Sequence, residues 1–429
     1  ILTQAQNAKK QTEVGSEKEA ISLAYSGAVL AKVEEGGGAV TASDLENQFN
    51  LNGVTDVNDV NGDNPITVTF ENGNKYSIDS SGNITKVEPP KSVIPGKYYE
   101  EDTDVLVGDK TVAIPGGATV SGIDGENESI DDGFVIYITN GEGVDWNKDD
   151  DTDGIKDVQE TYDQFVWVPV EKAYVTVEEI GGDSIDNLKT YIANNDNKIY
   201  PMAIKISDSE YKGILYDFEE ETNGVTITPY DYNANSDSNP SYREPDVVSY
   251  YDTGSYASEK VTKSGLQAEF KEMVEGVATK GGFWVGRYET SNMVNDNTKD
   301  STNVVKVVKG TISGINNANW YRMYAQQKNY KNNLKQSKNI KSSMIWGSQW
   351  DQIMIWMKDI KNGNNYYITN SIGFGNFGLD GDKYQNTENP AKTGCFEVKK
   401  IYDLAGNVWE WTLEAHSTNG RVYRRRFLL

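Results

Sequence analysis

The chain contains almost no cysteine and almost no histidine: Cys395 and His416 are the only residues of their types among 429. One cysteine excludes an internal disulfide and a cysteine-rich zinc site, and one histidine excludes a metal centre built from several imidazoles. No apolar run approaches the roughly 18 residues that a membrane-spanning helix requires. The sequence also has no Gly-rich phosphate loop, nucleophile elbow or Ser/His/Asp pattern that would indicate a common class of enzyme.

Positive charge is also scarce, since 41 basic residues face 65 acidic ones and the net charge is −24. A surface of this sign repels nucleic acid and anionic lipid, so nucleic acid is not expected as a partner. The length leaves room for two or three domains with a sizeable core.

The first 32 residues predict one long helix. They contain no proline, are rich in Ala, Lys, Glu and Gln, and form one apolar stripe with residues three or four apart: Ile21, Ala24, Ala28 and Ala31. Glycines 36–38 end this helix, and "TASDLENQF" predicts a short second helix with Thr41 or Ser43 as its N-cap.

Residues 65–90 alternate β-forming side chains with turn signals. The turns fall at Asn72-Gly73 and Ser81-Gly82, which predicts a three-stranded meander that Pro89-Pro90 closes. Beyond Pro90, short β-like runs alternate with Asn/Asp/Ser/Gly-rich connectors, typical of one large irregular domain. The fold class predicted is therefore α+β, with domains over residues 1–90 and 91–429.

Few helices are expected in the second domain. The best candidates are "SGLQAEFKEMVEGVA" and "GSQWDQIMIWMKDI", and the latter places four apolar side chains on one face: Trp350, Ile353, Met354 and Met357. The stretch Asp231–Tyr256 is poor in aliphatic residues and is expected to be a surface insertion.

"DDDTDGIKDVQE", residues 149–160, fits the calcium-loop pattern D-x-[DN]-x-[DN]-G-x5-E. The pattern assigns one turn residue, Gly154, and six ligands: the side chains of Asp149, Asp151, Asp153, Asp157 (through water) and Glu160, and the main-chain oxygen of Ile155. No amphipathic helix precedes the loop, so an isolated calcium loop is expected rather than a paired EF-hand. A merely solvated acidic loop is the alternative.

The segment "ILTQAQNAKKQTEVGSEKEAISLAYSGAVLAK", residues 1–32, resembles type IV pilin-like proteins of Gram-positive bacteria, just after the membrane-spanning half of their N-terminal helix. In that family a positively charged leader and an apolar helix precede these residues. The resemblance implies other pilin-like subunits as partners, and membrane contact only through a hydrophobic N-terminal helix absent from this chain. It also implies an extracellular or cell-surface location on a Gram-positive bacterium. Any amphipathic helix packed on a small sheet is the alternative.

Four blocks in the second domain occur in a recognisable order: "GGFWVGRYE" (281–289), "NANWYRMYAQQ" (317–327), "WGSQWDQIMIWM" (346–357) and "IYDLAGNVWEWT" (401–412). Their order and spacing resemble the formylglycine-generating enzyme family, also called the sulfatase-modifying factor family, whose fold is a variant of the C-type lectin fold. After "RVYR" that family continues with Gly-Gly-Ser and final strands. Here "RRFLL" follows, so we expect the second domain to be truncated or frame-shifted at its C-terminus.

The last block combines a glycine turn with carboxylates. Gly406 permits a turn that aims main-chain carbonyls inward, and carbonyls with carboxylates suit Ca²⁺. The resemblance implies the calcium ligands: the side chains of Asp403 and Glu410 and the main-chain oxygens of Gly406 and Val408. An acid that accepts backbone hydrogen bonds in a metal-free turn is the alternative.

The resemblance does not extend to the oxidase chemistry. Enzymes of this family oxidise a substrate cysteine with copper held by two cysteine thiolates downstream of the W-E-W block, and this chain has no cysteine after Cys395. We therefore expect no catalytic residues, and Ca²⁺ as the only cofactor.

The expected function is a surface-displayed, calcium-stabilised, non-catalytic binding protein, an adhesin or minor pilin of a pilus-like assembly. Its surface ligand, a protein or a glycan, is unknown. The alternatives are an oxidase of the formylglycine-generating type, a retroelement-diversified ligand-display protein, and a purely structural filament subunit.

Overall fold

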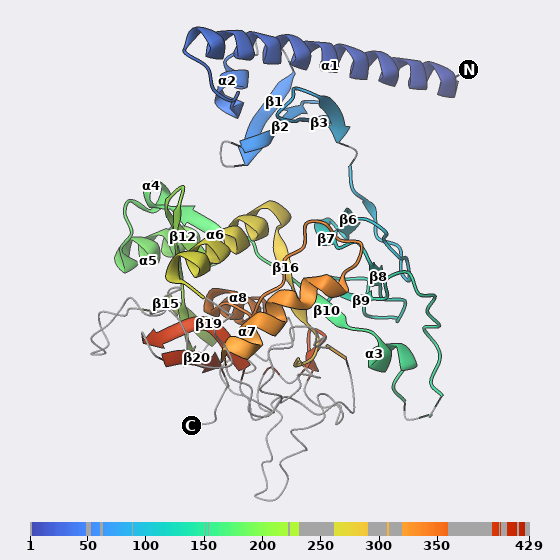
Figure 1. The fold of residues 1–429 in the computed structure, drawn as a ribbon, viewed down its shortest axis with the longest axis vertical. Coiled ribbons are helices and arrows are strands. Elements are labelled where there is room, and N and C mark those ends of the chain that lie inside the picture. The colour runs from blue at the N-terminus through green and yellow to red at the C-terminus, as the bar shows by residue number, and fades with distance from the viewer. Residues whose placement is uncertain are drawn as a thin grey trace, which may run out of the picture. The chain divides into compact units, whose positions relative to one another are not determined.

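The computed structural model of the chain describes residues 2–48, 53–60, 63–87, 89–150, 152, 154–221, 224–230, 261–290, 307–308, 320–358, 397–402, 404, 410–417 and 420–424. The chain divides into two compact units, Ile1–Pro90 (unit 1) and Lys91–Leu429 (unit 2). Each combines helices with small sheets, so the α+β class is confirmed (Figure 1). None of the helices within these ranges has the length and apolarity needed to cross a bilayer.

Unit 1 is a long helix packed on a four-stranded antiparallel sheet of order β1-β2-β3-β4 (Figure 1). Its elements are α1 (Leu2–Glu34), α2 (Ala42–Glu46), β1 (Val54–Val60), β2 (Asp63–Phe70), β3 (Lys75–Ile78) and β4 (Ile84–Val87). The predicted long helix is confirmed, and its buried side chains Ile21, Ala24 and Ala28 join the core of the sheet. Of the two N-cap candidates for α2 the structure selects Thr41, whose hydroxyl accepts a hydrogen bond from the Asp44 amide at 3.3 Å.

The three predicted strands of the meander are β2, β3 and β4. The structure adds a fourth strand, β1, which pairs antiparallel with β2. The sequence of β1, "VTDVNDV", is rich in Asp and Asn, which are uncommon in strands. It forms a strand because the partner is available and because Val54 and Val57 pack against the core. Tertiary contact thus overrides local propensity here.

Glu17 ties α1 to the meander. Its carboxylate is buried and accepts hydrogen bonds from Asn72 Nδ2 at 2.6 Å, Asn74 Nδ2 at 2.9 Å and Tyr76 OH at 2.5 Å. A buried carboxylate is tolerated only when its oxygens are satisfied in this way. Burial, with the Glu17 hydrogen bond, raises the pKa of Tyr76, so the phenol keeps the proton that it donates.

Unit 2 is built from several small sheets and short helices. Its described helices are α3 (Asp157–Thr161), α4 (Val177–Ile180), α5 (Ile185–Asn194), α6 (Lys263–Lys280), α7 (Trp320–Asn329), the 3₁₀ turn η2 (Tyr330–Asn333) and α8 (Gly347–Lys358). The predicted helices over 264–278 and 347–360 are α6 and α8. The segments α5 and α7 were not predicted as helices, although α5 carries an N-cap, Ser184, and buries Leu188 and Ile192.

The strands of unit 2 form six small sheets in the described ranges. Their orders are β16-β10-β9-β8, β5-β6-β7, β11-β12-β13, β14-β15, β17-β18 and β19-β20. The bounds are β5 (Lys91–Ser92), β6 (Thr103–Val107), β7 (Lys110–Ile114), β8 (Ala118–Val120), β9 (Val135–Ile138), β10 (Gln164–Pro169), β11 (Tyr174–Thr176), β12 (Ala203–Ser207), β13 (Glu210–Gly213), β14 (Tyr216–Glu221), β15 (Gly224–Pro229), β16 (Gly282–Gly286), β17 (Glu397–Val398), β18 (Ile401–Tyr402), β19 (Glu410–Ser417) and β20 (Gly420–Arg424).

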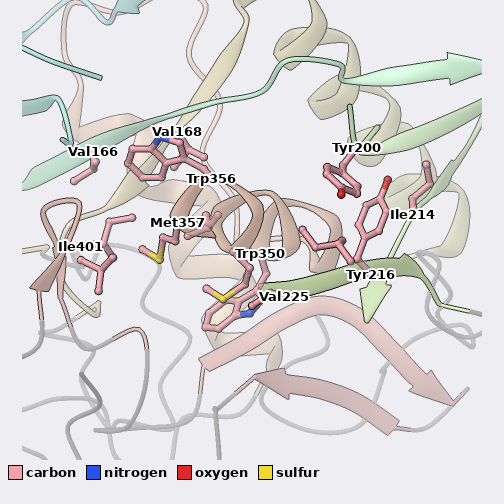
Figure 2. Close-up of a cluster of buried hydrophobic side chains, with 14 of the residues drawn as sticks. Val166, Val168, Tyr200, Ile214, Tyr216, Val225, Trp350, Trp356, Met357 and Ile401 are labelled. Atoms are coloured by element: carbon pink, nitrogen blue, oxygen red, sulfur yellow. The ribbon is translucent and has the colours of Figure 1, made fainter. Parts of the chain in front are cut away.

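Helix α8 lies in the middle of the largest hydrophobic cluster of unit 2. Figure 2 shows Trp350, Trp356 and Met357 of this helix among side chains from the surrounding strands. The prediction of one apolar face is too narrow, because ten of its twelve residues are buried. Asp351 is tolerated inside because its Oδ2 accepts a hydrogen bond from the Tyr216 amide at 2.9 Å. The insertion predicted at Asp231–Tyr256 lies outside the described residues.

Replacing Glu17 tests its role in unit 1. Glu17→Ala leaves three donors without their acceptor, so we expect about 1–3 kcal/mol less stability in unit 1. All nine tryptophans lie in unit 2, which allows the units to be followed separately. Hydrogen exchange of the meander amides should accelerate, while the thermal transition in tryptophan fluorescence stays unchanged. Glu19→Ala, at an exposed position of the same helix, is the control, and equal exchange in the two variants would contradict the prediction.

Candidate functional site

The block Gly281–Glu289 begins with two glycines that the structure requires. Gly281 ends α6 in the left-handed conformation, with φ +75°, and donates its N–H to Val277 O. A Cβ on Gly282 would lie 2.4 Å from the Val168 carbonyl oxygen, which leaves no room for a side chain. The glycines therefore let α6 turn directly into β16, which pairs antiparallel with β10.

The structure brings the four predicted blocks together. Tyr402 of the last block donates its amide to Arg287 O at 2.9 Å, and its ring stacks on Tyr288 with 5.0 Å between centroids. Further along β19, the Thr412 carbonyl accepts a hydrogen bond from Trp320 Nε1 at 2.8 Å. The Leu413 amide then reaches Ile345 O, just before the third block, at 2.9 Å. Segments far apart in the sequence thus share one core.

At the centre of this arrangement lies an ion pair between two buried side chains, Arg287 and Glu126, with 2.7 Å between Nη2 and Oε1. Arg287 Nη1 also donates to Gln164 Oε1 at 3.0 Å and to Tyr137 OH at 3.3 Å. The second oxygen of Glu126 accepts hydrogen bonds from Ser121 Oγ at 2.7 Å and from Tyr137 OH at 3.0 Å. We call these five residues the arginine network.

The electrostatics of the network keep the arginine charged. Burial alone would lower the pKa of Arg287, but Tyr288, Glu126 and the neighbouring phenols raise it well above its usual value. Burial raises the pKa of Tyr137, which therefore stays a neutral donor to Glu126. At this centre, Arg287 Nε and Tyr288 OH are buried and have no hydrogen-bond partner in the structure.

The predicted calcium loop, residues 149–160, is attached to this network at both ends. Upstream of the loop, the Trp146 ring meets the Tyr137 ring edge to face at 5.1 Å. Downstream, Gln164 donates its side-chain amide to the Gln159 carbonyl of α3 at 2.6 Å. The two ends of the loop therefore contact side chains that bond to the buried ion pair.

The described part of the loop has the backbone features that the calcium pattern requires. Gly154 has φ +86°, the left-handed turn expected at the sixth position. Helix α3 begins at Asp157, which places Glu160 in its first turn. Asp149 Oδ1 is buried without a hydrogen-bond partner, so one oxygen that the pattern assigns to the metal is available. These observations fit Ca²⁺.

The other ligand positions of the loop either lie outside the described residues or already interact with protein groups. Asp151 and Asp153 lie outside the described residues, while Ile155 and Glu160 already take part in protein interactions. Asp157 is engaged by Lys148, with 2.9 Å between Nζ and Oδ2, and this hydrogen bond lowers its pKa. Within the described ranges, three or more acidic, cysteine or histidine side chains do not converge on one metal position.

The second predicted calcium site is described only at its end. Glu410 begins β19, where its backbone pairs with Arg424. The other three ligand positions, Asp403, Gly406 and Val408, lie outside the described residues, as does Cys395. The calcium ligands expected in this block therefore remain a prediction.

No sequence pattern predicted the arginine network. Its one visible signal was a lone arginine directly after an apolar strand, in "GGFWVGRYE". Its partner Glu126 lies in "GIDGENESIDDG", where acids are common and nothing distinguishes it. Only the tertiary structure pairs the two. Neither a model of a known protein family, nor a curated protein, nor a solved structure matches the chain.

The buried pair gives a stability prediction with an internal check. Arg287→Met leaves Glu126 buried without its partner, and we expect a loss of about 3–5 kcal/mol in chemical denaturation. The double variant Arg287→Met with Glu126→Gln should recover much of this loss, because no isolated charge remains. Lys280→Met, which breaks the exposed pair with Asp104, should change stability by less than about 1 kcal/mol. A double variant no more stable than Arg287→Met would show that packing, and not charge, sets the loss.

Proposed function

We propose that the chain is a surface-displayed, calcium-stabilised, non-catalytic binding protein, an adhesin or minor pilin of a pilus-like assembly. In this proposal unit 1 is a pilin-like stalk, and unit 2 is a C-type lectin-like domain of the formylglycine-generating enzyme type. The observation that carries the proposal is an exposed apolar stripe on α1.

The stripe consists of Leu23, Leu30 and Val33, whose side chains are 70%, 62% and 66% exposed. At 100° per residue these positions share one side of the helix, and Ile21, Ala24 and Ala28, which pack on the sheet, lie on another. Unit 1 leaves the stripe uncovered, although exposed apolar surface of this kind commonly marks a contact site. The stripe of a second copy would cover it, as expected of a filament subunit.

Calcium has a structural role in this proposal. The loop 149–160 gathers several carboxylates, whose mutual repulsion a divalent cation would relieve. Because the loop contacts the arginine network at both ends, ordering it would stabilise the core of unit 2. Millimolar extracellular calcium matches the affinity of such isolated loops.

A binding role, and not catalysis, fits the position of the motif residues. Arg287, Tyr288 and Tyr402 are all buried and occupied with one another. They support the core and are not placed to contact a substrate. The family's copper chemistry uses two thiolates, and this chain has one cysteine.

Calorimetry tests the calcium loop. The wild type should bind Ca²⁺ and gain about 2.7 kcal/mol of stability at a calcium concentration one hundred times the Kd. Asp151→Ala with Asp153→Ala should abolish binding to this loop and the gain. Asp131→Ala with Asp132→Ala removes the same charge from another exposed turn. This control should leave calcium binding by the loop and the gain in stability intact. Equal binding by the wild type and the Asp151/Asp153 variant would exclude the loop as a site.

Assembly through α1 is tested by ultracentrifugation at increasing protein concentration. Leu23→Ser with Leu30→Ser should shift the self-association constant of the wild type at least about ten-fold towards monomer, because two exposed leucines lose their apolar contact. The control Val87→Ser with Ile94→Ser removes two exposed apolar side chains that lie outside α1. A monomeric wild type at all concentrations would contradict the assembly role.

A further inference from the structure

One segment of this acidic chain contains no acid at all. From Ser301 to Trp350 there is no Asp or Glu, while the segment carries seven lysines and one arginine. A local charge of +8 in a chain of net charge −24 means that the remaining residues sum to −32. The segment is therefore net positive because it lacks acids, although most of the 41 basic residues lie elsewhere in the chain.

Part of this segment is described, and its lysines fall into two groups. Lys328 and Lys341 form ion pairs with Glu269 and Glu272 of α6. The other three are exposed and form no ion pair within the described residues: Lys331, Lys335 and Lys338. We call these three residues the lysine strip. It follows α7, the orange helix of Figure 1.

The backbone that carries the strip is held in place at three points. Ser342 Oγ accepts a hydrogen bond from the Lys331 amide at 2.8 Å. Asn140 donates to Asn333 O at 3.0 Å, and its Oδ1 accepts from the Lys335 amide at 3.3 Å.

The third point is Asp102, whose carboxylate accepts hydrogen bonds from Ser337 Oγ at 2.6 Å and from the Asn339 amide at 3.2 Å. Asp102 is an acid beside the strip, and its oxygens accept hydrogen bonds from neutral donors. With the backbone fixed, little conformational freedom beyond the lysine side chains is lost when an anion binds.

We propose that the lysine strip binds a linear phosphate polymer. This proposal names a class of ligand for the binding role proposed above, and it rests on that role. Clustered lysines with no carboxylate partner attract an anion at short range, within the Debye length of about 8 Å. The strip contains lysine and no arginine. Lysine binds phosphate as a compact point charge, and the strip has no arginine fork, which would bind either a carboxylate or a phosphate bidentately. The rest of the chain has a net negative charge, which on average repels an anion.

The test measures binding of long-chain inorganic polyphosphate to the full chain at low salt by fluorescence anisotropy. The buffer contains EDTA, because polyphosphate chelates Ca²⁺. Without free Ca²⁺ the measurement does not depend on calcium binding by the loop 149–160, so the two proposals are tested separately. The strip variant carries Lys331→Gln, Lys335→Gln and Lys338→Gln. The matched control carries Lys75→Gln, Lys91→Gln and Lys189→Gln, three exposed lysines elsewhere with the same change in charge. Tryptophan fluorescence checks that unit 2 of each variant stays folded.

The strip variant should weaken binding at least about ten-fold, and the slope of log Kd against log salt should fall by about three. The control variant should change neither the Kd nor the salt slope by a comparable amount. Absence of wild-type binding, or equal weakening in both variants, would overturn the proposal. Polyglutamate bound as tightly as polyphosphate would overturn the assignment to phosphate.

Discussion

A guanidinium and a carboxylate that are both almost fully buried must neutralise each other, because either one alone would be very unfavourable inside a protein. In unit 2 the Arg287–Glu126 pair meets this requirement, and the hydroxyls of Ser121 and Tyr137 satisfy the oxygen of Glu126 that Arg287 does not pair with. The pair joins the end of β16 to the segment before β9. The predicted calcium loop and the stacked Tyr288 and Tyr402 contact the same group of residues.

Charge is distributed unevenly along the chain, and this organises the proposed roles. Acids crowd the loop 149–160, where a divalent cation would offset their repulsion, while residues 301–350 contain only basic charges. In a protein of net charge −24 the acidic loop is unfavourable without a cation. The basic segment instead pairs Lys328 and Lys341 with acids of α6, and only the lysine strip forms no ion pair within the described residues. The same electrostatic reasoning therefore leads to calcium at one segment and to an anionic polymer at the other.

Unit 1 solves a different problem, the support of a long helix by a small sheet. Apolar contacts from Ile21 and Ala28 supply the packing, and the Glu17 carboxylate supplies specificity, because it meets three donors from one end of the sheet. The stripe residues Leu23, Leu30 and Val33 lie on another side of α1 and stay exposed. The proposed association would use the side of α1 that this packing leaves exposed.

The sequence by itself determined the local features: the long helix, a short second helix capped at Thr41 or Ser43, helices α6 and α8, and a sharp turn at Gly154. Each depends on residues within a few positions of one another, where propensity and capping act directly. Only the tertiary structure decided that β1 forms a strand, that α8 is buried on nearly all sides and that Arg287 meets Glu126. These depend on partners distant in sequence, and an isolated glutamate or an Asp-rich strand carries no local sign of its partner.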